Sequence, residues 1–351
     1  MPDEGSFPVA PRRPGEPPGT TTTEVVCIGH AIVDRLAHVE AATVEASGVE
    51  PESMTLVDGE QIARIVKLVG GWVQVAGGSA ANTAVGLASL GSSVTFVGSV
   101  GSDALGARYE GDLGAVGVRC VLGRGKAGLP TGQCLVLVTA DSLRTMATNL
   151  GAGVVIDLEA VERAGVATAA AVYIEGYLLD SPGTLAAMER LIELAKAAGG
   201  LVALSLSDPF LVERHAEALN ELVAGKVDVL FANEEEARRF TGAGDLCGAL
   251  AALEQTGLLA AVTLGPKGAV LLNGKERASV EAWSVGPVDD TTGAGDLFAA
   301  GVLHGIVRGA PLEVAGRLGA LAAAEVVSHL GAQPEVSLHA LAAEAGLGGP
   351  F

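Results

Sequence analysis

The sequence predicts an α/β fold in which a mostly parallel sheet is covered by helices on both faces. Short apolar runs rich in Val, Ile and Leu recur along the chain, and longer stretches with the apolar spacing of helices separate them. Runs that are apolar throughout are typical of strands buried on both faces. The expected strands are 25–28, 95–97, 172–175, 201–206, 227–231 and 260–264.

The clearest predicted helix follows Ser181. Pro182 comes directly after this serine, and apolar residues then recur with helical spacing up to Leu194, before Gly199 and Gly200. Serine at the cap, proline in the first turn and glycine after the last turn favour a helix with these limits. We therefore expect a helix that is capped by Ser181 and ends before Gly199.

A second, smaller sheet is predicted in the first half of the chain. Residues 32–38, 72–75 and 131–139 alternate polar and apolar side chains, which is expected of a sheet with one exposed face. We interpret them as a lid inserted into the larger unit, with segments at approximately 32–40, 70–77 and 118–148.

The chain has 351 residues and a mass of 35.0 kDa, which allows one large α/β unit with an appendage or two domains. We assign residues 24–345 to one large domain that includes the lid. Residues 1–23 are rich in Pro, Gly and Thr and are expected to be a disordered tail.

Charge and cysteine content exclude several classes of function. Lys and Arg number 22 against 41 Asp and Glu, so the net charge is −19, which disfavours binding to nucleic acid and to anionic membranes. No apolar run reaches the ~18 residues of a membrane span, and the first residues lack the apolar core of a secretion signal. The four cysteines are scattered, so no disulfide framework or zinc site is indicated. We expect a cytoplasmic protein with a small-molecule partner, as a monomer or a homodimer.

The strongest motif is DTTGAGD at 290–296. It follows an expected strand at about 280–285 and opens an apolar helical run. Small residues at a helix start allow backbone N–H groups to approach an anion, and the helix dipole favours negative charge there. Asp296 in the first turn is placed to accept a proton from a hydroxyl group. The alternative is an ordinary helix start with an aspartate that interacts with the dipole.

The pentapeptide TGAGD occurs a second time, at 241–245. This copy joins the end of one expected helix to the beginning of another, whereas the copy at 292–296 follows a strand and therefore lies at the carboxyl edge of the sheet, where open α/β folds bind ligands. We assign the anion site to 292–296 and interpret Asp245 as a helix cap.

Three weaker motifs accompany it. The stretch 77–82 (GGSAAN) allows close approach of a ligand, and Asn82 can donate and accept hydrogen bonds to a polyol. Asn233 and Glu236 in NEEE form a capping-box pattern, yet carboxylates at a strand end would also attract hydrated Mg²⁺. The segment 263–268 (TLGPKG) is either a border of a nucleotide site or a hairpin turn.

These four motifs, in this order over residues 24–335, resemble those of the ribokinase-like (PfkB) family of carbohydrate and nucleoside kinases. The resemblance implies a three-layer α/β/α domain with a small β-sheet lid. It also implies transfer of the γ-phosphoryl group of ATP to a primary hydroxyl group, with Mg²⁺ and often K⁺.

The resemblance also implies roles for individual residues. Asp296 would be the base, and the backbone amides of Gly293, Ala294 and Gly295 would hold the phosphoryl charge. The remaining positions would be Asp34, Gly77, Gly78 and Asn82 on the sugar hydroxyl groups, Asn233 and Glu236 at Mg²⁺, Asn233, Thr263, Gly265 and Gly268 at the nucleotide, and Asp290 at the monovalent ion.

Within the family the sequence is most similar to the adenosine kinases. GHAIVD at 29–34 is similar to their first substrate loop, Arg144 lies where they place an arginine near the transferred phosphate, and Tyr177 matches an aromatic residue that stacks on the nucleobase. His30 differs, because these kinases commonly have Asn there, near the base.

The sequence thus leads to the hypothesis of an ATP-dependent kinase that phosphorylates the 5′-hydroxyl group of a nucleoside, adenosine above others. One alternative is a sugar kinase that acts on the hydroxymethyl group of a furanose or keto sugar. Another is a non-catalytic ligand sensor with the same fold, which the intact 290–296 motif disfavours.

Overall fold

The computed structural model describes residues 23–51, 53–125, 128–139 and 143–349. The expected tail at 1–23 therefore lies outside the described residues, except for Thr23. Within the described ranges, no helix is both long and apolar enough to cross a membrane.

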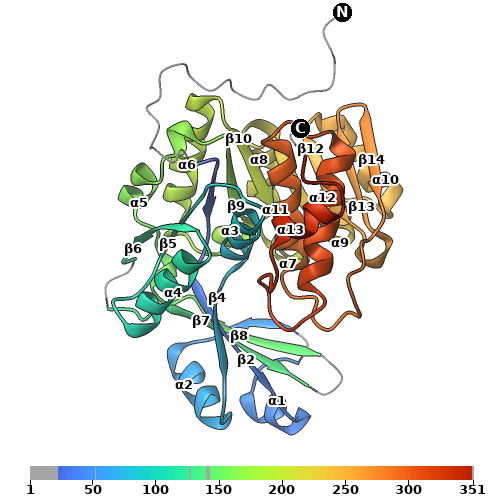
Figure 1. Cartoon of the computed structure of the whole chain (residues 1–351). Helices are drawn as coiled ribbons and strands as arrows, with labels where there is room; N and C mark the ends of the chain where they lie inside the picture. Colours follow the sequence, from blue (N-terminus) through green and yellow to red (C-terminus); the bar gives the residue numbers. More distant parts are fainter. Residues whose placement is uncertain (1–22, 52, 126–127, 140–142, 350–351) are drawn as a thin grey trace, which may run out of the picture.

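A nine-stranded sheet forms the centre of the larger unit (Figure 1). The order is β14-β13-β12-β11-β10-β9-β1-β5-β6; the seven strands from β12 to β6 are parallel, and β13 and β14 add an antiparallel hairpin at one edge. The strands are β1 (Val25–Ile28), β5 (Val94–Ser99), β6 (Arg119–Gly123), β9 (Ala171–Glu175), β10 (Leu201–Ser205), β11 (Val229–Asn233), β12 (Leu259–Thr263), β13 (Ala269–Asn273) and β14 (Glu276–Val280).

Helices cover both faces of this sheet, because side chains of the central strands are buried on both sides. One face packs against α5 (Leu158–Arg163), α6 (Leu185–Ala198), α7 (Pro209–Arg214), α8 (Ala216–Gly225), α9 (Glu234–Thr241) and α10 (Leu246–Thr256). The other packs against α3 (Ser79–Ser89), α4 (Ala104–Ala115), α11 (Ala294–Ile306) and α12 (Leu312–Val326), with α13 (Leu338–Glu344) outside them. The predicted three-layer α/β/α class is confirmed.

A second sheet of five strands forms the lid, which lies below the larger unit in Figure 1. Its order is β3-β8-β7-β2-β4, with β2 (Ile32–His38), β3 (Met54–Leu56), β4 (Val73–Gly77), β7 (Gly132–Val138) and β8 (Arg144–Asn149). Helices α1 (Ala41–Ser47) and α2 (Gly59–Leu68) pack on one face of it.

The structure differs in three details from the elements expected from the sequence. Residues 119–123, expected in the lid, form edge strand β6 of the large sheet, and the lid instead gains β3. The strand expected at 280–285 ends at Val280. Helix α6 begins at Leu185 after Thr184, because the Ser181 hydroxyl group is engaged by His30 and does not cap it.

Close packing fixes the position of α11, the helix that follows the DTTGAGD motif. A Cβ atom on Gly301 would lie 2.4 Å from the carbonyl oxygen of Leu318, and one on Gly319 would lie 2.8 Å from that of Phe298. Because neither glycine has a side chain, α11 and α12 approach each other closely. The start of α11 is thereby held rigidly at the carboxyl edge of the sheet.

Candidate active site

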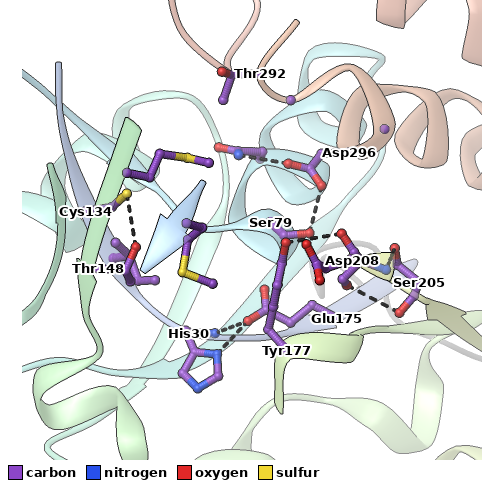
Figure 2. Close-up of a pocket in the computed structure, with 18 of the residues that line it drawn as sticks. His30, Ser79, Cys134, Thr148, Glu175, Tyr177, Ser205, Asp208, Thr292 and Asp296 are labelled. Carbon is purple, nitrogen blue, oxygen red and sulfur yellow. Dashed lines mark hydrogen bonds and ion pairs between the residues drawn. The ribbon is translucent and has the colours of Figure 1, made fainter. Parts of the chain in front are cut away.

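Asp296 lies in the first turn of α11 and is held by side chains of α3 (Figure 2). The hydroxyl group of Ser79 donates to Oδ1 of Asp296 at 2.7 Å, and the Nδ2 group of Asn82 donates to Oδ2 at 2.9 Å. The Thr83 hydroxyl group also donates to the backbone carbonyl of Asp296 at 3.2 Å. The carboxylate is therefore held in one orientation by two helices that are more than 200 residues apart in sequence.

The surroundings of Asp296 suit a base. Burial raises its pKa to about 7, with a further contribution from the negative charge of Glu175, although the hydrogen bonds from Asn82 and Ser79 oppose this rise. Burial also raises the pKa of Asp34 to about 7, and the charge of Asp296 adds to it. A carboxyl group with a pKa near neutral pH can accept a proton and later release it.

The turn before α11 provides part of the expected anion site. Gly293 caps the helix with φ 79°, and a Cβ atom there would lie 2.8 Å from Ala332. No side chain caps this helix start. Gly293 and Gly295 line a cavity, but Ala294 does not, and its N–H donates to the carbonyl of Thr291 at 3.3 Å. The structure therefore supports amide groups of Gly293 and Gly295 at this site more directly than that of Ala294.

A cavity of about 1000 Å³ lies between the lid and the carboxyl ends of the central strands. Pockets for small ligands occupy roughly 300–1,000 Å³, so this volume is at the upper end. Strands β9 to β12 contribute their last residues, and the lid contributes an apolar and sulfur-containing wall. The strand ends are Glu175, Ser205, Asn233 and Thr263, and the apolar side chains of the lid are Ile32, Met54, Leu56, Cys134 and Met146.

Of the residues expected at the sugar hydroxyl groups, Asp34, Gly78 and Asn82 line the cavity, whereas Gly77 is not among its lining residues. A Cβ atom on Gly77 would lie 2.0 Å from Oδ2 of Asp34, and one on Gly78 would lie 2.3 Å from the carbonyl oxygen of His30. Gly78 also has φ 97°, which favours glycine. The two glycines therefore allow the turn between β4 and α3 to pass close to Asp34 and to the backbone of His30.

His30 lines the cavity and is held by Glu175 and Ser181. Its Nδ1 lies 2.8 Å from Oε1 of Glu175, its Nε2 lies 3.1 Å from Oγ of Ser181, and its backbone N–H donates to the same Glu175 oxygen at 2.7 Å. The second Glu175 oxygen accepts from the Ala80 N–H at 2.8 Å. Both ring nitrogens are thus engaged within the protein. Through Glu175, His30 is joined to the start of α3, and its place near a nucleobase stays a prediction.

Tyr177 lies in the one-turn helix η3 (Gly176–Asp180) and lines the cavity. Its hydroxyl group donates to the carbonyl of Ser207 at 3.1 Å, so the ring is held at a fixed angle (Figure 2). Ser207 has φ 66°, the left-handed region, and Asp208 caps α7 while also lining the cavity. Glu175, Ser207 and Asp208 also line the cavity and were not predicted from the sequence. The positions of Glu175 and Asp208 at or just beyond strand ends were the available signal.

Asn233 and Glu236 form the predicted capping box at the start of α9. Asn233 accepts from the Glu236 N–H at 2.8 Å, and its own N–H and Nδ2 groups donate to Glu236 at 2.9 and 2.7 Å. Burial raises the pKa of Glu236 to about 7, and the charges of Asp208, Glu235 and Asp296 contribute to the rise. Both residues line the cavity.

Thr263 also lines the cavity, but Gly265 and Gly268 do not. Gly265 belongs to the one-turn helix η4 (Gly265–Lys267) between β12 and β13. Gly268 has φ 90°, and a Cβ atom there would lie 2.0 Å from the carbonyl oxygen of Val280. Close packing of the β13–β14 hairpin thus explains why this position is a glycine.

Arg144 and Asp290 are the other two expected site residues that lie outside the cavity lining. They form an ion pair with each other, and the role of Arg144 near the transferred phosphate stays a prediction. Asp245 caps α10 through a hydrogen bond from the Gly248 N–H at 2.8 Å, as predicted.

Comparison with known proteins places the chain in a family. A family model described as pfkB family carbohydrate kinase matches residues 22–338. A crystal structure of a probable sugar kinase from Rhizobium etli is 38% identical, covers 93% of this chain and 100% of its own, and has a TM-score of 0.88. The crystal structure of adenosine kinase from Sinorhizobium meliloti is 39% identical, covers 92% and 99%, and has a TM-score of 0.86.

A further relative, of lower sequence identity, is also a kinase. Adenosine kinase from Saccharomyces cerevisiae is 28% identical over 336 residues, which are 88% of this chain and 96% of that protein. The family match, the fold and the carboxylate at the start of α11 agree with one another. The chain therefore belongs to the pfkB family of carbohydrate kinases, and it is a phosphotransferase that acts on an alcohol group of a small nucleoside or sugar.

Proposed function

We propose that the chain transfers the γ-phosphoryl group of ATP to the 5′-hydroxyl group of a nucleoside, with adenosine as the preferred acceptor. The observation that carries this proposal is the Asp296 carboxyl group, which lines the cavity at the start of α11 with a pKa raised to about 7 by burial. Phosphoryl transfer depends mostly on positioning and on stabilisation of charge, and this turn offers both.

Asp296 acts as the base in the proposed reaction. It accepts the proton of the acceptor hydroxyl group while that oxygen forms a bond to the γ-phosphorus atom. The bond between this phosphorus and the bridging oxygen of ATP breaks, and ADP leaves with the electron pair. The N–H groups of Gly293 and Gly295 stabilise the negative charge of the moving phosphoryl group.

The wall formed by Asn233 and Glu236 fits a hydrated Mg²⁺ ion. Burial raises the pKa of the Glu236 carboxyl group to about 7, and repulsion from the negative charges of Asp208 and Asp296 adds to the rise. A divalent cation at this wall would relieve that repulsion, and Mg²⁺ usually keeps several of its waters. Asn233 and Glu236 would hold it through water, and the ion would supply positive charge to the phosphate oxygens.

The lid side of the cavity favours a nucleoside over a free sugar. Ile32, Leu56 and Met146 face the cavity, and Tyr177 presents an aromatic ring with an anchored hydroxyl group. A flat nucleobase would cover these apolar groups, whereas a free sugar would leave them exposed to water. Asp34 and Asn82, which also line the cavity, would contact the ribose hydroxyl groups, and we propose that the lid closes over the acceptor.

The test is ADP formation with Mg²⁺ and a panel of acceptors: adenosine, guanosine, inosine, cytidine, ribose, fructose and none. We expect turnover with adenosine to exceed that with any sugar, and Tyr177→Leu to raise the KM for adenosine more than the KM for ATP. Turnover with sugars alone would favour the sugar kinase alternative. Nucleoside binding without turnover would favour a ligand sensor.

A further inference from the structure

Asp290, the first residue of the DTTGAGD motif, has an enclosed carboxylate whose two oxygens are both engaged. The side chain is fully buried. Its Oδ1 accepts from the Thr292 N–H at 2.6 Å, and its Oδ2 accepts from the Gly331 N–H at 2.9 Å. The guanidinium group of Arg144 forms an ion pair with Oδ1. A buried carboxylate requires such a partner, because desolvation penalises the charged form.

This arrangement does not fit the monovalent cation expected near Asp290. The positive charge is already supplied by Arg144, whose side chain is only 14% exposed. A second cation beside the same carboxylate would be repelled by the guanidinium group.

The ion pair connects the lid to the turn that precedes α11. Arg144 is the first residue of lid strand β8, and Asp290 precedes the turn that Gly293 ends. The same turn is joined to the segment after α12, because the Asp289 N–H donates to the carbonyl of Val327 at 2.8 Å. The orientation of the anion-binding turn therefore depends on a residue of the lid.

The segment after α12 also contacts the lid directly. The side-chain amide of Gln333 donates to the carbonyl of Ala76 on β4. Leu330 packs on the lid cluster formed by Leu36, Cys134, Val136 and Val138. Several contacts thus join the lid, the turn before α11 and the segment 327–333. Among these contacts, the one between Arg144 and Asp290 is an ion pair.

We propose that Arg144 is a positioning residue: its guanidinium group takes the place of a monovalent cation beside Asp290 and couples lid position to the anion-binding turn. The kinase therefore requires no K⁺. The kinetic test of this inference rests on the proposed function, whereas the measurement of Tm needs no substrate.

The first experiment compares K⁺ with choline as the sole monovalent cation at equal ionic strength, in the full-length protein with Mg²⁺, ATP and adenosine. We expect kcat/KM to agree within about twofold, which corresponds to under about 0.5 kcal/mol. A larger increase that is specific to K⁺ would overturn the proposal. Absence of turnover in both salts would count against the proposed function, while the thermal measurements would still test the ion pair.

The second experiment measures Tm without substrate in KCl and in choline chloride. Arg144→Gln should lower Tm because it leaves the Asp290 carboxylate buried without a counter-charge. KCl should then raise Tm more than choline chloride does. Arg108→Gln is the matched control, since Arg108 forms an exposed pair with Asp112 and such pairs contribute little.

Two further variants keep the test decisive if Arg144→Gln does not fold. Arg144→Lys retains the positive charge and should keep a Tm closer to that of the wild type, without a response to K⁺. The double variant Arg144→Gln with Asp290→Asn removes both charges, so it should be more stable than Arg144→Gln alone and insensitive to K⁺. A Tm for Arg144→Gln equal to that of Arg108→Gln, or a double variant no more stable than the single one, would refute the coupling.

Discussion

The two copies of TGAGD provide a controlled test of the proposed base, because Asp296 and Asp245 occupy the same position in identical pentapeptides. Replacing Asp296 by Asn keeps the shape of the side chain and removes its ability to accept a proton. The Asn oxygen can accept from Asn82, and its amide can donate to the Ser79 hydroxyl group, which can turn to accept. We therefore expect Asp296→Asn to fold and to bind substrates.

Loss of a general base typically reduces the rate by roughly 10²–10⁴-fold. At 1.36 kcal/mol for each factor of ten, the barrier should rise by about 3–5 kcal/mol. Asp245 only accepts from the Gly248 N–H at 2.8 Å, and Asn is about as good an N-cap as Asp. Asp245→Asn should therefore leave the rate within about twofold of the wild type.

The assay is ADP formation with adenosine under saturating ATP, with substrate affinity measured separately by calorimetry. We expect the kcat of Asp296→Asn to fall while the dissociation constant for adenosine changes little. Equal rate losses in the two variants, or an unchanged rate in Asp296→Asn, would refute the assignment of the base.

Three other predictions follow from the same site. Because the base has a pKa of about 7, kcat/KM should fall about tenfold for each pH unit well below 7; a rate that is flat down to pH 5 would contradict this. Asp34, Glu236 and Asp296 all have pKa values raised to about 7, so the folded protein binds more protons than the unfolded chain between about pH 4 and 7. Stability without ligands should therefore decline as pH rises through this range, and the slope of Tm against pH should be smaller in Asp34→Asn. Gly293→Ala should reduce kcat and cost about 1–2 kcal/mol of stability, since φ is 79° there; denaturant unfolding with wild-type stability would contradict it.

The parts of the fold that were predicted from sequence depend on local patterns. Apolar runs such as 25–28 and 201–206 identified central strands because a strand buried on both faces has no polar side. The capping box at Asn233 and the cap at Asp245 are likewise local and were recognised correctly. The start of α6 was misplaced because Ser181 bonds to a residue 151 positions away.

The candidate site was predicted in part for the same reason. Asp296 could be recognised from its own motif, but its partners Ser79 and Asn82 are brought to it only by the packing of α3 against α11. The buried pairs that His30 forms with Glu175 and Arg144 with Asp290 span 145 and 146 residues, respectively. Pairings over such distances leave no periodic signal in the sequence.

The proposed transfer to the 5′-hydroxyl group is tested most directly with adenosine and 5′-deoxyadenosine side by side and ATP labelled at the γ-phosphate. The two acceptors differ only in the hydroxyl group that Asp296 is proposed to deprotonate. We expect transfer of label to adenosine, with the phosphate on the 5′ oxygen by ³¹P NMR, and binding of 5′-deoxyadenosine without transfer. Label on 5′-deoxyadenosine, or phosphate on another oxygen of adenosine, would contradict it.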